Sequence, residues 1–189
     1  MTKSHLKTLF LLIATAIGTS GCVIGTIVKS ELSAYAEPTT GELAHIRLIG
    51  SRNVKVYPAS TCPSVNVVGS GYPAGPQMGG QRKRDLGMPK IQVAPKHYVE
   101  IAARAGEPIT AAFTVGRYQG AYQLSCSVAG TFVPQAGRNY ELVASWMGTQ
   151  CVAQAYEIVS AGELNERRRV PTVAAECARP DPETSPQQG

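Results

Sequence analysis

The sequence predicts an all-β fold: one small antiparallel β-sandwich domain that disulfides stabilise. Short runs rich in Val, Ile, Thr, Tyr and Phe recur along residues 42–160, and turn signals containing Gly or Asn separate them. Only residues 161–169 have the composition of a short helix. Five cysteines in a chain of 189 residues are a third sign, because small exported domains commonly supplement their core with disulfides.

Residues 1–21 have the form of an export signal. Lys3 and Lys7 precede an apolar run of signal-peptide length, LFLLIATAIG. The TSGC that follows resembles the lipobox of bacterial lipoproteins, although Thr19 stands where that motif usually has Leu. The resemblance implies cleavage before Cys22 and attachment of a diacylglycerol and an amide-linked acyl chain such as palmitate, which together anchor a protein stably. By resemblance to enteric-type lipoproteins, a residue other than Asp in the next position, here Val23, implies the outer membrane, with the protein facing the periplasm.

Two alternatives for the N-terminus stay open. Leu9–Val28 is an apolar run of 20 residues, long enough for a membrane-spanning helix. Ala34–Ala36 reads AYA, a pattern that an ordinary signal peptidase cuts, and cleavage there would release a soluble periplasmic protein. All three interpretations imply export to an oxidising compartment.

The cysteine count fits a lipidated chain with two disulfides. With Cys22 assigned to lipid, four cysteines remain, and they can pair in three ways. We favour Cys126–Cys151, which would join neighbouring strands, and Cys62–Cys177, which would tie a long loop to the tail. No C-x-x-C motif occurs, so we expect no metal site and no cofactor.

The first half of the mature chain divides into a tether, two strands and a loop. Residues 22–41 read as a lipid-anchored tether, and 42–50 and 54–58 as strands. Val54 and Val56 alternate with Lys55 and Tyr57, the period of a half-buried strand. Residues 59–96 contain too many Gly and Pro for regular structure and form a loop longer than most connections.

The second half contains the remaining strands and a tail. We predict strands at 97–103, 108–115, 121–128 and 150–159, and two short strands around a turn within 131–146. Residues 161–189 are expected to form a short helix or coil and then a disordered tail rich in Pro. The predicted core consists of Leu43, Ile46, Leu48, Val54, Val56, Ile101, Ile109, Phe113, Leu124, Phe132, Tyr140, Leu142 and Tyr156.

Three segments carry a family resemblance. YVEIAARAGEPITAAF, YQLSCSVAGTFVPQAGRNYELV and the loop segment RKRDLGMP resemble a group of uncharacterised proteobacterial lipoproteins. The resemblance implies a small immunoglobulin-like or transthyretin-like β-sandwich. It implies no activity, since none is established for that group.

Charge and residue inventory argue against nucleic-acid binding and against catalysis. The net charge of +5 falls to +3 when Lys3 and Lys7 leave with the signal, and the basic segments 82–84 and 166–169 lack interleaved aromatic residues. The mature chain has two histidines, His45 and His97, both in or beside predicted strands, and two aspartates. No nucleophile, metal-hydrolase or phosphate-binding motif is present. We therefore expect a protein that is not an enzyme.

The best candidate contact surface is the 59–96 loop. It is expected to present five residues to a partner: Tyr72, Met78, Arg82, Arg84 and Met88. Trp146, the only tryptophan, lies near a strand end, where it either packs in the core or stacks on a sugar. The sequence thus predicts an anchored sandwich that binds another envelope protein or a cell-wall glycan. The alternative is an inhibitor or ligand-binding protein acting on a cell-wall hydrolase or glycan.

Overall fold

The structure is a computed structural model that describes residues 33–51, 53–64, 66–73, 84–91, 95, 97–161, 164–174 and 177. The predicted signal, Cys22 and the first part of the tether lie outside these residues. Within the described part of the chain, no helix is long and apolar enough to span a membrane. The described residues form nine strands: β1 (Leu43–Ile49), β2 (Asn53–Pro58), β3 (Tyr98–Arg104), β4 (Ile109–Gln119), β5 (Tyr122–Phe132), β6 (Asn139–Met147), β7 (Gln150–Ala161), β8 (Leu164–Arg169) and β9 (Val173–Ala174).

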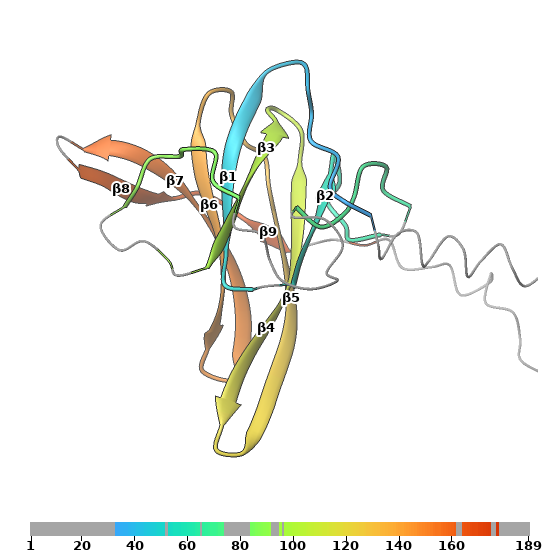
Figure 1. The fold of residues 1–189 in the computed structure, drawn as a ribbon, viewed down its shortest axis with the longest axis vertical. Coiled ribbons are helices and arrows are strands. Elements are labelled where there is room, and N and C mark those ends of the chain that lie inside the picture. The colour runs from blue at the N-terminus through green and yellow to red at the C-terminus, as the bar shows by residue number, and fades with distance from the viewer. Residues whose placement is uncertain are drawn as a thin grey trace, which may run out of the picture.

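The strands form two sheets that pack face to face, which confirms the predicted β-sandwich (Figure 1). One sheet has the order β3-β1-β6-β7-β8 and the other β2-β4-β5-β9. Every neighbouring pair is antiparallel except β1 and β6, which run parallel. Across the sandwich β5 packs on β7 and β4 on β6.

The core lies between the sheets and contains most of the predicted residues. Ten of them are buried: Ile46, Leu48, Val54, Val56, Ile101, Ile109, Phe113, Phe132, Tyr140 and Leu142. Leu43, Leu124 and Tyr156 are only partly buried. Gly130 of β5 shows how closely the sheets approach, since a Cβ there would lie 2.9 Å from the Cβ of Ala153 on β7.

Residues 161–169 do not form the predicted helix or coil. Residues 164–169 form β8, which extends the sheet beside β7. Strand alternation sends the side chains of Arg167 and Arg168 to opposite faces, where they bind Glu141 and Glu157 respectively. Pairing with β7 and with two buried carboxylates therefore overrides the local helical composition.

The outer face of β2 is also more buried than its alternation predicts. Lys55 and Tyr57 are 6% and 8% exposed, because Gly71 exchanges backbone hydrogen bonds with Val56 and brings its segment along the strand. The Lys55 ammonium lies between the rings of Tyr57 and Tyr72, 5.7 and 5.8 Å from their centroids.

Both predicted disulfides are present. Cys62 and Cys177 have Cα atoms 4.9 Å apart, and their bond ties the loop after β2 to the segment after β9. Cys126 and Cys151 have Cα atoms 6.3 Å apart. They lie on β5 and β7, so this bond joins the two sheets. The sequence predicts a bond between neighbouring strands, and this part of the prediction is wrong.

Candidate functional site

Two hairpins extend together beyond the rest of the sandwich (Figure 1). β2 pairs with β4 only as far as Thr114, and β1 pairs with β6 only as far as Val143. The β4–β5 and β6–β7 hairpins continue past these points to two-residue turns at 120–121 and 148–149. We call residues 117–124 and 146–150 the hairpin tip.

Side chains between the hairpins hold the tip together. The guanidinium of Arg117 lies 4.2 Å from the Trp146 ring centroid and donates a hydrogen bond of 3.0 Å to the carbonyl of Gly148. The Cys126–Cys151 disulfide joins the same two hairpins a few residues away. The tip is thus a cross-linked unit, and Trp146 packs within it instead of standing free for sugar stacking.

The tip exposes aromatic and apolar side chains beside uncharged polar ones, Gln119, Gln123 and Gln150. Tyr118, Tyr122 and Met147 are 79%, 77% and 65% exposed. No Asp or Glu occurs in residues 108–140 or 142–156, which include the whole tip. Exposed Tyr and Met without neighbouring acids are the composition of protein interfaces, where charged residues are depleted and aromatic residues enriched.

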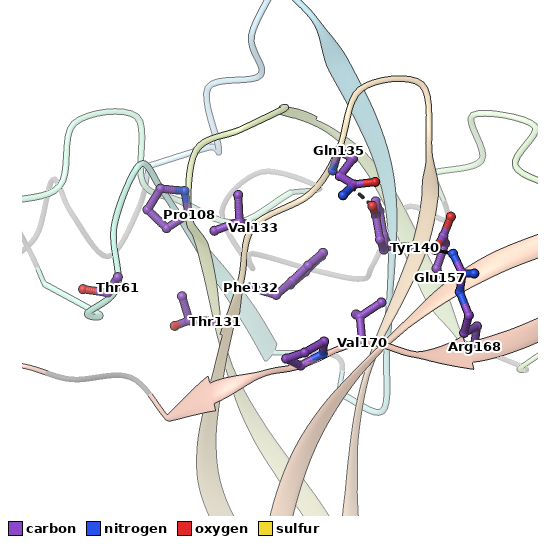
Figure 2. Close-up of a pocket in the computed structure, with 11 residues that line it drawn as sticks. Thr61, Pro108, Thr131, Phe132, Val133, Gln135, Tyr140, Glu157, Arg168 and Val170 are labelled. Carbon is purple, nitrogen blue, oxygen red and sulfur yellow. Dashed lines mark hydrogen bonds and ion pairs between the residues drawn. The ribbon is translucent and has the colours of Figure 1, made fainter.

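A second candidate is a pocket of about 490 Å³ at the side of the sandwich. Figure 2 shows Phe132 between Gln135 and Val170, with Thr61 and Pro108 on one side and Tyr140, Glu157 and Arg168 on the other. The pocket is lined by Thr61, Pro108, Thr131, Phe132, Val133, Gln135, Tyr140, Glu157, Arg168, Val170 and Pro171. An apolar pocket of this size with a few polar groups is typical of small-molecule sites.

Glu157 is the main charged group of the pocket. Its side chain is 5% exposed, and Arg168 binds its Oε2, which raises the pKa of Arg168. Its Oε1 lies 3.2 Å from the Arg138 guanidinium but receives no hydrogen bond among the described residues. The phenol oxygen of Tyr140 accepts a hydrogen bond from the backbone amide of Gln135. These groups make one wall of the pocket polar.

The outer face of the five-stranded sheet carries a buried ionic layer. Arg47 of β1 lies between Glu100 of β3 and Glu141 of β6, at 2.7 and 2.8 Å, and all three are at most 4% exposed. Arg167 of β8 binds the other oxygen of Glu141 at 2.5 Å. Burial lowers the pKa of Arg47, but its hydrogen bonds to Glu141 and Glu100 outweigh this and raise it. Arg47 therefore stays charged and paired with both carboxylates.

The described end of the long loop, residues 84–91, covers this layer and crosses toward the β7–β8 hairpin (Figure 1). The carbonyls of Met88 and Pro89 accept hydrogen bonds from Arg47, and the amides of Leu86 and Met88 donate to Glu100. These contacts satisfy groups that would be costly to bury alone.

The structure separates the three predicted contact residues of the loop that it describes. Met88 is buried, and Arg84 binds Glu37 of the tether. Tyr72 is half-buried beside Lys55. Met78 and Arg82 lie outside the described residues. Contact through this loop stays a prediction, but its described end functions as a cover for the sheet.

Three of the four groups considered for catalysis lie among the described residues. His45 and His97 are exposed, Asp85 accepts a hydrogen bond from Tyr98, and Asp181 lies outside the described residues. No three His, Cys, Asp or Glu side chains in the described ranges gather as metal ligands. Sequence analysis missed the ionic layer, whose only signal is a single charge within each of the apolar runs HIRLI, VEIAA and YELVA.

Comparison with protein-family models, with curated proteins and with solved structures finds no match to this chain. The resemblance to uncharacterised lipoproteins therefore stays an expectation from the sequence.

Proposed function

We propose that the protein is a non-enzymatic lipoprotein of the cell envelope, anchored through Cys22, that binds another envelope component through the hairpin tip. The exposed and cross-linked tip is the observation that carries this proposal. Rigid aromatic side chains lose little entropy on binding, so Tyr118 and Tyr122 are efficient anchors for a partner.

The contacts of the tether support anchoring at Cys22 over cleavage at AYA. Tyr35 is buried, and its hydroxyl donates a hydrogen bond of 3.0 Å to the carbonyl of Ala102. Glu37 accepts a hydrogen bond from the Ala102 amide. Cleavage after Ala36 would remove Tyr35 from the folded domain, whereas cleavage before Cys22 retains it.

The tip is tested by replacing both tyrosines. We expect the double variant Tyr118→Ser, Tyr122→Ser to fold normally and to lose the partner that co-purifies with the wild-type protein, because both side chains are largely exposed in the free domain. Leu164→Ser is the matched control, since Leu164 is 52% exposed and lies on β8, outside both the tip and the pocket. Equal recovery of the partner with both variants would exclude the tip as the contact surface.

The pocket favours a second candidate function, binding of a small ligand such as a glycan fragment. Its apolar walls and the Glu157 carboxylate suit a molecule with an apolar face and a hydrogen-bond donor. Val170→Trp would fill the space without removing a polar contact. If ligand binding is the function, this variant loses it while the tyrosine variant keeps it.

A further inference from the structure

The exposed strand edges of this sandwich differ in how they are protected. At β3, the amide and carbonyl of Ala102 bind Glu37 and Tyr35, and the amide of Glu100 binds the carbonyl of Arg84. At β2, Gly71 exchanges two backbone hydrogen bonds with Val56. β8 carries four successive charged residues, 166–169, a common defence against pairing with another chain.

Among the described residues, none of these protections covers residues 122–129 of β5. β9 pairs only with Gly130 and Thr131, so in the described chain no strand pairs with the outer edge of residues 122–129. This stretch contains no charged residue, and no proline interrupts it. An uncharged open edge of this length is a template for another strand.

The sequence of this edge is close to symmetric about Cys126. It reads QLSCSVA over residues 123–129. In an antiparallel pair of two copies centred on Cys126, Ser125 faces Ser127 of the other copy and Leu124 faces Val128. Ser125 and Ser127 are exposed on the outer face, while Leu124 and Val128 are partly buried on the inner face. These side chains therefore face similar ones on both faces, while Gln123 faces Ala129, and the twofold axis repeats each contact twice.

The position of β9 limits the register of that pair. Pairing centred on Cys126 uses residues 123–129 of each copy and stops where β9 begins to pair with β5 at Gly130. A shift in one direction would require residues that β9 already occupies, and a shift of more than one residue in the other would enter the β4–β5 turn at 120–121. The symmetric segment thus covers all but one residue of the edge that no described strand pairs with.

We propose that two copies of this chain associate through antiparallel pairing of their β5 edges, joining two four-stranded sheets into one. This inference concerns the edge of β5 and does not depend on the partner of the hairpin tip. The occupant is a second copy because the segment is complementary to itself and carries no charge that would repel across the twofold axis.

Charge placement tests the pairing directly. Ser125→Lys with Ser127→Lys places two like-charged pairs opposite each other, whereas Ser125→Lys with Ser127→Glu places two opposite-charged pairs there. We expect native mass spectrometry of the full, detergent-released chain to show a dimer for the wild type, a monomer for the Lys/Lys variant and a dimer for the Lys/Glu variant. Ser145→Lys, an exposed position on β6 in the other sheet, should remain dimeric.

Each result has one meaning for the proposal. A wild-type protein that is monomeric at about 100 μM overturns it, as does a Lys/Lys variant that remains dimeric while folded. Loss of dimer in Lys/Glu as well would also overturn the proposed register. The Tyr118→Ser, Tyr122→Ser variant separates the two proposals, because it should lose the tip partner and keep the dimer mass.

Discussion

Arg47 determines whether the outer face of the five-stranded sheet can carry buried charge. It is the only cation within ion-pair distance of Glu100 among the described residues, and it shares Glu141 with Arg167. A buried ion pair adds little net stability compared with apolar packing, but removal of one partner leaves an uncompensated charge. The cost of losing Arg47 is therefore larger than the benefit that the pair confers.

Replacing Arg47 by Met should destabilise the protein by about 3–5 kcal/mol. Urea unfolding monitored by circular dichroism measures this free energy. Arg104→Met is the control, because Arg104 and Glu107 form an exposed pair at 3.5 Å and such pairs contribute about 0–1 kcal/mol. Equal effects of the two substitutions would show that the ionic layer is not buried as described.

Tyr35 gives the protein a pH dependence in alkaline solution. Burial raises the pKa of its hydroxyl, with a smaller contribution from Glu37, so the folded state holds the proton that the unfolded state releases above about pH 10. This contribution to stability is complete below the unfolded pKa and is lost as the pH rises toward the folded pKa. We expect Tyr35→Phe to cost about 1 kcal/mol at pH 8, through the lost hydrogen bond to Ala102.

The wild-type advantage over Tyr35→Phe should then shrink by about 1.4 kcal/mol per pH unit above pH 10. Unfolding free energies of both proteins at pH 8, 10 and 11 measure this difference. An advantage that stays constant over this range would mean that Tyr35 is solvated in the folded protein.

At the scale of elements, the two hairpins form a tip only because they are joined. The Cys126–Cys151 bond closes a sequence separation of 25 residues and Arg117 bridges to Trp146 and Gly148. The chain-entropy model gives an upper figure of about 3.5 kcal/mol for a loop of this size. Neither β2 nor β1 pairs with the hairpins along the tip, so the disulfide holds the hairpins together where neighbouring strands do not.

The double variant Cys126→Ser, Cys151→Ser should lose up to about 3.5 kcal/mol of stability. The loss of protection against hydrogen exchange should be concentrated in residues 117–124 and 146–150, while β1 stays protected. Exchange measured by mass spectrometry on peptides resolves the two regions. Uniform loss of protection across β1 and the tip would show that the disulfide supports the whole sandwich and not the tip alone.

The covering loop is unsuitable for a deletion test of partner contact. Deleting residues 70–88 would remove the carbonyl of Met88 and the amides that bind Arg47 and Glu100. Such a deletion would uncover the ionic layer, so loss of a partner would not separate contact from folding. Point substitutions at the exposed tip avoid this problem.

For the whole molecule, the sequence predicts what depends on local pattern. Alternation and turn residues place the strands near their observed bounds, and the four cysteines left after Cys22 allow three pairings, of which the favoured one is observed. The parallel pairing of β1 with β6 and the formation of β8 depend on distant residues and have no local signal. The tip was missed for the same reason. Tyr118 lies between the predicted strands 108–115 and 121–128, and its exposure depends on where the neighbouring strand β2 ends.

The proposed anchoring predicts the mass of the mature protein. Protein purified from membranes should begin at Cys22 and carry acyl groups, and alkylation after reduction should add four thiol adducts from the two disulfides. Intact mass spectrometry measures both quantities. A chain that begins at Glu37 would mean a soluble periplasmic protein, and one that retains Met1 would mean an N-terminal membrane anchor.

Site-specific photocrosslinking in living cells tests the central claim, contact through the hairpin tip, most directly. A photoreactive residue at Tyr118 is compared with one at Val68, which is 92% exposed but lies far from the tip in the loop after β2. We predict a discrete adduct with a different envelope protein from position 118 and none from position 68. No adduct at position 118, or the same adduct from both positions, would contradict the account.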